Sequence, residues 1–162
     1  MGNLSEIGVF KRAIVDAILE DKLSVDLIKP DKPEGFEPED LFMENVFDYG
    51  KVPDINEKAE TFVTVDAGVP EVLNNKLLKD VEFRITIISH DGVMRVPGSV
   101  LTRVDYLASR IDELLNGSRE FGGVSEVELI SSMPGVLDTG QPFKVNIYRV
   151  VEVNGNHCGV DL

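Results

Sequence analysis

The side chains with the widest chemical repertoire in this chain are its two histidines, and neither has partners at a useful spacing. His90 lies between Ser89 and Asp91, which together offer a nucleophile, a base and a carboxylate. Consecutive residues of an extended chain point to alternate sides, so these three cannot relay a proton among themselves. His157 and Cys158 are adjacent, whereas zinc ligands are usually separated by a short spacer. We therefore expect neither a catalytic triad nor a metal site.

Carboxylates and glycines give no clearer sign of catalysis. The chain has 29 aspartates and glutamates, so their number alone does not exclude a hydrolytic pair. None of them stands in a recognisably apolar stretch that would shift its pKa. The glycines match neither a phosphate-binding loop nor a dinucleotide-binding fingerprint. The sequence thus predicts a protein that is not an enzyme and binds no cofactor.

Length and composition indicate one domain. The 162 residues, of which 43% are apolar, are enough for a single buried core. No apolar run approaches the roughly 18 residues of a membrane span, and the polar start of the chain lacks a signal pattern. Cys158 is the only cysteine, so no internal disulfide is expected. We expect a soluble, unexported protein with no membrane partner.

The net charge of -13 is uneven along the chain, because residues 31–60 hold ten acids and only three lysines. An acidic surface repels phosphates, so specific binding of DNA or RNA is not expected. The simpler interpretation of this stretch is a solvated loop. The alternative is an acidic channel or docking loop past which DNA slides without sticking. The candidates for that second role are Glu37, Glu39, Asp40, Glu44 and Asp48.

Apolar residues at helical spacing predict two main helices, over residues 4–20 and 101–116. Asn3 and Glu6 form a capping-box-like start for the first, and Gly117 supplies a stop for the second. A short turn is expected over residues 24–28. Residues 29–59 are expected to form a loop that contains a short helix or edge strand at 41–47. The second helix carries one apolar stripe, formed by Val104, Leu107, Ala108, Ile111, Leu114 and Leu115.

Alternation of apolar and polar residues predicts strands over residues 61–66, 80–89, 126–130 and 143–153. We expect Gly68 and Pro70 to end the first strand, and Pro134 and Gly135 to form a hairpin tip after the third. The order of elements predicts an α/β fold of the α+β type, a mostly antiparallel sheet of four to five strands with two main helices packed on one face. The domain covers residues 1–153, with the acidic insertion at 29–59 and a flexible tail at 154–162. On the last strand one side is apolar, formed by Phe143, Val145, Ile147, Val151 and Val153.

Several side chains are candidates for contacts with other subunits. Arg95 lies in the loop before the second helix, where a grip on a neighbour's carboxylate and plain solvation are both open. Met133 adjoins the expected hairpin tip, where core packing is the alternative to an interface. The other candidates lie off the apolar stripe of the second helix or on the long last strand. The full set is Arg95, Arg103, Arg110, Met133, Tyr148 and Arg149.

The layout resembles that of the bacteriophage tail terminator (tail completion or neck) proteins of long-tailed phages. The resemblance rests on element order and size: an N-terminal helix at 4–20, a long strand at 80–89, a helix at 101–116, and closing strands at 126–130 and 143–153. It carries over no residue motif and no catalytic residue.

The resemblance implies a small, acidic, non-enzymatic subunit that forms a homo-oligomeric ring, typically a hexamer. Such a ring caps the tail tube, docks on the head connector or head-completion protein, and leaves a channel for DNA. The resemblance places the protein in the tail or neck of the virion, after assembly in the host cytoplasm. The alternatives are another head–tail connector or head-closure subunit, or a small carboxylate-dependent hydrolase.

Overall fold

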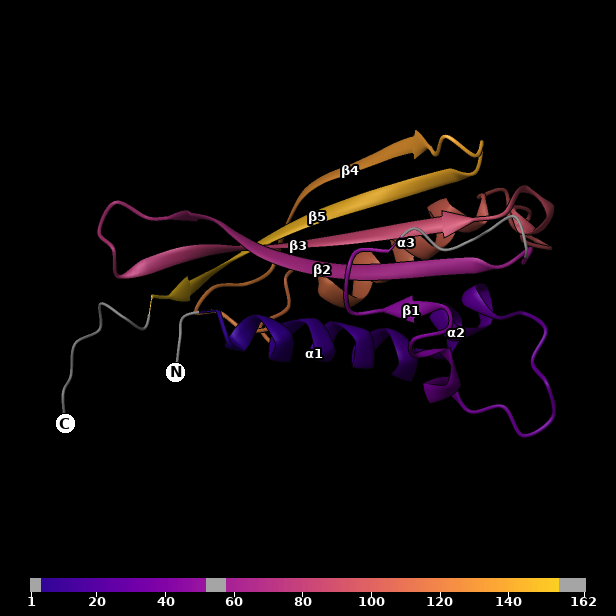
Figure 1. Cartoon of the computed structure of the whole chain (residues 1–162), viewed down its shortest axis with the longest axis horizontal. Coiled ribbons are helices and arrows are strands. Elements are labelled where there is room, and N and C mark those ends of the chain that lie inside the picture. Colours follow the sequence, from indigo (N-terminus) through magenta and orange to yellow (C-terminus); the bar gives the residue numbers. More distant parts are fainter. Residues whose placement is uncertain (1–3, 52–57, 155–162) are drawn as a thin grey trace.

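The computed structural model describes residues 4–51 and 58–154, which form one five-stranded sheet with α-helices on one of its faces (Figure 1). The strand order across the sheet is β1-β2-β3-β5-β4. Only β1 runs parallel to its neighbour, β2; the other pairs are antiparallel. This arrangement confirms the predicted fold class. The strands are β1 (Val46–Phe47), β2 (Thr61–Val72), β3 (Leu78–Ser89), β4 (Glu128–Val136) and β5 (Pro142–Val153).

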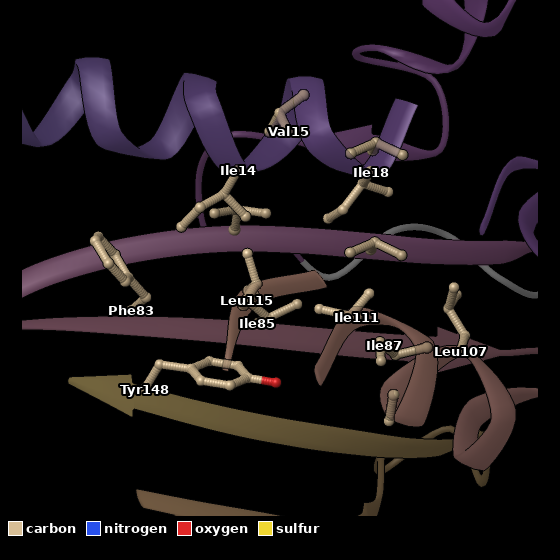
Figure 2. Packing of buried hydrophobic residues seen from close by; sticks show 14 of the residues in the cluster. Ile14, Val15, Ile18, Phe83, Ile85, Ile87, Leu107, Ile111, Leu115 and Tyr148 are labelled. Atoms are coloured by element: carbon tan, nitrogen blue, oxygen red, sulfur yellow. The ribbon is translucent and has the colours of Figure 1, made fainter. Parts of the chain in front are cut away.

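Three α-helices of the described chain cover the same face of the sheet: α1 (Glu6–Glu20), α2 (Lys22–Ile28) and α3 (Arg103–Leu115). Their apolar side chains meet alternate residues of β3, among which Phe83, Ile85 and Ile87 are fully buried (Figure 2). The stripe predicted for α3 forms part of this core, with Leu107 and Ile111 fully buried. Period-2 alternation on β3 and the apolar stripe on α3 therefore correctly identify the two sides of the main core.

Both ends of the chain differ slightly from the predicted boundaries. α1 begins at Glu6, while the Asn3 of the predicted capping box lies outside the described residues. Asn154, assigned to a flexible tail, is buried, and its side-chain amide donates to the Lys76 carbonyl at 2.8 Å. The remainder of that tail, residues 155–162, lies outside the described part of the chain.

Two strands continue through residues that were expected to end them. β2 runs to Val72, and an irregularity in its pairing between Gly68 and Glu71 accommodates Pro70. β4 contains Pro134 and Gly135, and the turn to β5 lies later, where the Leu137 N–H donates to the Gln141 carbonyl at 2.9 Å. Proline is tolerated in both places because β4 is an edge strand and the Pro70 segment of β2 lies beyond the two-residue β1.

The acidic insertion is more structured than a solvated loop. A 3-10 turn at Pro38–Leu41 is capped by Glu37 and Asp40, and β1 follows at the sheet edge. Leu41 is buried in the core, and Arg12 of α1 bonds to Glu39 at 2.6 Å. Of the two forms predicted for residues 41–47, the edge strand is confirmed as β1, and the 3-10 turn lies mostly before this range. Residues 52–57 lie outside the described residues.

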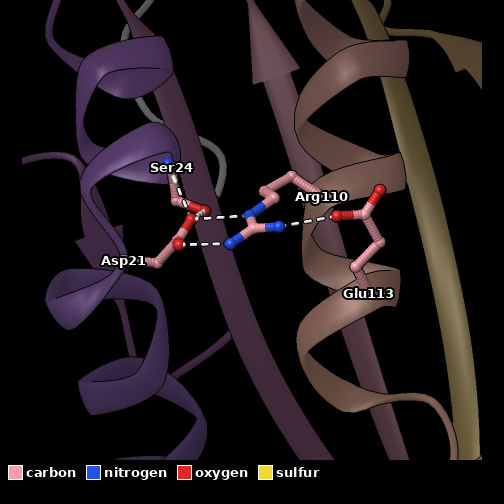
Figure 3. A network of polar contacts seen from close by, with 4 residues as sticks. All are labelled: Asp21, Ser24, Arg110 and Glu113. Carbon is pink, nitrogen blue, oxygen red and sulfur yellow. Dashed lines mark hydrogen bonds and ion pairs between the residues drawn. The ribbon is translucent and has the colours of Figure 1, made fainter.

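The junction between α1 and α2 is joined to α3 by a charged network (Figure 3). Asp21 caps α2 by accepting from the Ser24 N–H at 2.9 Å. The same carboxylate receives two bonds from Arg110, at 3.0 and 2.7 Å. These bonds, with those from Ser24, lower the pKa of Asp21 to about 2, although burial opposes the shift. The ionised form of Asp21 is therefore favoured by folding.

Replacing Asp21 with asparagine should lower the free energy of unfolding by about 1–2 kcal/mol at neutral pH. Asparagine can still cap α2, so the change isolates the charge. Because the folded pKa is depressed, the loss should be constant above about pH 5 and should shrink as the pH falls from about 4 toward 2. Urea unfolding of both proteins across this range measures it.

Glu113→Gln is the matched control. Glu113 is an exposed partner of the same guanidinium, at 2.6 Å, so its loss should change stability by no more than about 0.5 kcal/mol. Equal effects of the two substitutions, or a pH-independent effect of Asp21→Asn, would contradict this account of the ion pair between Asp21 and Arg110.

Candidate functional site

The face of the sheet opposite the helices, here called the open face, carries no helix among the described residues. Its composition follows from how β5 is oriented. Asn146 and Tyr148 of β5 point toward the helices, because α3 offers them polar partners. The Asn146 amide donates to the Ala108 carbonyl at 3.1 Å, and the Tyr148 hydroxyl donates to Asp112 at 3.1 Å. The apolar side of β5 is therefore left on the open face.

One end of the open face is apolar. The register aligns Phe62, Ile88 and Phe143 in one row across β2, β3 and β5. Phe47, Phe62 and Ile88 are buried there in a second, smaller cluster, with Leu137 and Phe143 packed against it. The next row aligns Val145 of β5 with two threonines and with the exposed Met133 of β4. These residues are Thr64, Thr86, Val145 and Met133.

A depression of about 370 Å³ is hollowed into this apolar end. Two cations, Lys51 and Arg84, stand in its lining, and the Lys51 ammonium lies 4.5 Å from the centre of the Phe47 ring. No carboxylate belongs to the lining, which is unusual in a chain with 29 acids and 16 basic residues. The other lining residues are Gly50, Thr64, Thr86, Ile88, Leu137, Phe143 and Val145.

The middle of the open face is a charged band. Arg84 lies 3.3 Å from Glu82, and Arg149 lies 3.6 Å from Asp80 and 3.7 Å from Glu128. The register places Asp66 directly opposite Arg84. The polar residues that alternate along β3, such as Glu82 and Arg84, thus lie on the open face. The part of β5 next to the depression places the apolar Phe143 and Val145 on the same face.

The outer edge of β4 has no strand partner in the described chain. Its exposed side chains are mostly apolar: Ile130, Met133 and Val136 are 48%, 63% and 67% exposed. Glu128 is the only charged residue on this strand. Edge strands that must stay unpaired usually carry lysines, prolines or bulges. β4 has Pro134 and a register shift, which hinder the pairing of another strand with its backbone, so what it offers to a partner is its exposed apolar side chains, next to the apolar end of the open face.

Two of the six predicted interface residues are buried, so that assignment was wrong for them. Arg103 is 4% exposed and donates to the backbone carbonyls of Val93 and Leu27, at 2.6 and 2.7 Å. Burial also lowers the pKa of Arg103. Tyr148 is fully buried between β3 and α3. Both side chains lie in the interior because buried carbonyls and Asp112 satisfy their polar atoms.

The other four predicted interface residues are at least partly accessible. Arg95 and Met133 are exposed, at the loop before α3 and on the open face. Arg110 and Arg149 are already engaged in ion pairs within the chain. The structure therefore brings only Met133, among the six, to the apolar end of the open face.

The predicted acidic docking residues gather around the 3-10 turn and β1. Glu37, Glu39, Asp40 and Glu44 are exposed and Asp48 is partly exposed. Glu37 and Asp40 cap the turn and Glu39 pairs with Arg12, so three of them also have a structural role. Their role toward DNA or a partner stays a prediction.

The titratable groups show pairing within the fold. Asp26, Glu60 and Asp105 have lowered pKa values: lysines hold Asp26 and Asp105 ionised, and Lys29 and Asn45 outweigh the effect of burial on Glu60.

The His90 ring accepts from the Gly92 N–H at 2.9 Å in a tight turn, while His157 and Cys158 lie outside the described residues. Within 4–51 and 58–154 there is no cluster of three residues that could ligate a metal, and no helix is long and apolar enough to span a membrane.

Comparison with known proteins assigns the family. A family model named YomW matches residues 14–150. The chain belongs to the YomW family. No curated protein matches it in sequence. Among solved structures, it is similar to a chain from the "Virion of native gene transfer agent (GTA) particle", with a TM-score of 0.56 and 14% identity. The similarity covers 88% of this chain and 92% of that one, and at this identity it concerns the fold.

Sequence reasoning missed the depression on the open face. Lys51 and Leu137 lie in segments expected to be loops, and their meeting with Phe143 depends on strand register. One signal was available: the last strand has more apolar residues on one side than on the side that carries Asn146 and Tyr148. A strand with a strongly apolar side turned away from the helices leaves a surface for another partner.

A substitution at Gly135 tests how the apolar end of the open face packs within the monomer. It faces Phe143 across the β4–β5 pair, and a Cβ at this position would overlap the Phe143 ring. We expect Gly135→Ala to displace the ring and to lower the free energy of unfolding by about 1–3 kcal/mol. Thermal and urea unfolding measure the change.

Gly68→Ala is the control on the same face, since a Cβ there meets no atom within 4 Å. This substitution should be neutral or stabilising by about 0.5 kcal/mol. A neutral Gly135→Ala would show that Phe143 does not pack over the β4 backbone.

Proposed function

We propose that this YomW-family protein is a structural component of a virion, and more specifically a tail terminator whose copies form a ring. Three observations support the proposal. The family is phage-derived, the fold is similar to that of a chain in a gene transfer agent virion, and the sheet leaves one face and one edge for other subunits. The ring would cap the tail tube, join it to the head connector or head-completion protein, and let DNA pass.

The observation that carries the proposal is the apolar end of the open face beside the unpaired β4 edge. Exposed apolar area of this kind is typical of a surface that another protein covers. A ring requires heterologous contacts, in which one surface of each copy meets a different surface of the next. The open face and β4 on one side, and the exposed acidic segment before β1 on another, provide two such different surfaces.

In the proposed ring the helices face outward and the sheet faces the channel. The charged band, in which the four acids Asp66, Asp80, Glu82 and Glu128 outnumber Arg84 and Arg149, would then lie toward the lumen. Acidic side chains repel the phosphates of DNA, so DNA can move past without binding. The net charge of -13 supports the same arrangement.

The proposal includes no catalysis. A carboxyl group serves best as a general acid near neutral pH when its pKa is raised, whereas each carboxyl group of the described residues with a resolved shift has a lowered pKa. Hydrolysis of generic phosphoesters or esters that is lost with a chelator and with a single carboxylate substitution would favour the hydrolase alternative.

Met133→Asp is the sharpest test of the ring. Met133 is 63% exposed on the open face, so the substitution should change the free energy of unfolding by less than about 0.5 kcal/mol. It should nevertheless abolish rings and caps seen by electron microscopy when tail tube protein is added, because a charge would be buried in the contact.

Val9→Asp is the matched control, since Val9 is 67% exposed on α1, on the outward side of the proposed ring. It should leave ring formation unchanged. Rings formed equally well by both variants would contradict the open face as the contact. Monomers of the unmodified protein, even with tube ends present, would contradict the ring itself, and binding to connector but not to tube would favour a head-closure subunit.

A further inference from the structure

The turn before β1, at residues 42–45, presents the apolar Met43 and the acidic Glu44, and its backbone is strained at Met43. Met43 has a φ of 65°, a left-handed value that a long side chain rarely adopts, and its side chain is 45% exposed. Backbone bonds fix the turn, with the Met43 N–H donating to the Val46 carbonyl at 2.8 Å and the Asn45 N–H to the Leu41 carbonyl at 2.9 Å. Glu44, next to Met43, is also exposed. The fold therefore presents one flexible apolar side chain and one carboxylate on a rigid turn.

The depression on the open face has the complementary chemistry. Its floor is apolar, with Ile88, Phe143 and Val145, and its charged lining residues are both cations, Lys51 and Arg84. A volume of about 370 Å³ is enough for a methionine side chain. An apolar side chain would fill the floor of the depression, and a carboxylate next to it would pair with the two cations.

The turn cannot reach the depression of its own chain. Phe42, which precedes Met43, packs under the guanidinium of Arg12 on α1, 4.2 Å from the centre of its ring. The turn is therefore anchored on the helix side of the sheet, whereas the depression is hollowed into the open face. The two surfaces can meet only between different copies.

We propose that the turn at residues 42–45 of one copy docks in the open-face depression of the next copy, with Met43 on the apolar floor and Glu44 beside Lys51 and Arg84. This contact rests on the proposed ring and specifies how neighbouring subunits meet in it. It is heterologous, as a closed ring requires. It covers the apolar end of the open face together with Arg84, and leaves the rest of the charged band open to the channel.

The substitution Met43→Gly distinguishes an effect on folding from an effect on assembly, because it relieves the backbone strain and also removes the side chain. Glycine adopts a positive φ freely, so Met43→Gly should leave the monomer as stable as before or more stable. It removes the side chain that fills the depression, and should raise the dissociation constant between copies by at least about tenfold. Lys76→Gly is the matched control, because Lys76 has a φ of 58° on the β2–β3 turn, far from the depression. It should leave assembly unchanged.

Charge exchange tests the pairing itself. Glu44→Lys and Lys51→Glu, made separately in the full chain, should each weaken assembly by about tenfold, measured by native mass spectrometry at low ionic strength. The double variant should assemble again, and so should an equal mixture of the two single variants, in which each contact has one partner of each kind. Glu34→Lys, an equal change of charge in the same acidic segment, should have a smaller effect.

The outcomes distinguish failure of the proposed contact alone from failure of the contact and the ring together. Rings of normal affinity in Met43→Gly, or no recovery in the double variant, overturn the proposed contact while the ring stands. In a Cys158→Ser background, oxidation of Met43→Cys, Val145→Cys chains should give a ladder of cross-linked oligomers. Rings without the ladder also overturn the contact, and monomers of the unmodified chain in every condition overturn the contact and the ring together.

Discussion

The arrangement of this protein depends on the polar seam between α3 and β5. Lys144, Asn146 and Tyr148 point from β5 toward α3 and meet Asp105, the Ala108 carbonyl and Asp112. Burial of these polar groups without partners would be costly, so the seam is stable only in this register and with this side of β5 inward. A shift of one residue would turn Val145 and Ile147 inward and leave Asn146 and Tyr148 on the surface. The seam therefore determines which side chains form the open face.

The seam also explains which features of the fold are predictable from sequence. The apolar stripe of α3 and the alternation of β3 are local patterns, and the structure confirms both. The inward side of β5 is not a local property, because its polar residues are buried only where α3 supplies partners. Arg103 and Tyr148 show the same limit: their residue types indicate a surface, but backbone carbonyls of distant segments and a carboxylate satisfy them in the interior.

The candidate site was harder to predict for a related reason. Pro134 and Gly135 normally indicate a turn, yet an edge strand tolerates proline, and Gly135 makes room for the Phe143 ring. The depression combines residues from five segments, so only the register of β2, β3 and β5 brings its apolar floor together. Met133, for which core packing and an interface were both open, is exposed, whereas Lys51 carried no signal of its position. The acidic segment was expected as a loop, and its buried Leu41 and Phe47 show why it is held against the sheet.

Taken with its membership of the YomW family, the fold suggests a subunit in which folding and assembly use opposite faces of one sheet. The helix-covered face supplies the core, and the proposed function assigns the open face to neighbouring subunits. Hydroxyl-radical footprinting of the protein before and after assembly tests this most directly. The account predicts strong protection of Met133 and Phe143 in the assembled state and unchanged labelling of Leu4 and Val9 on the helical side. Protection confined to α1, with Met133 labelled as in the monomer, would contradict it.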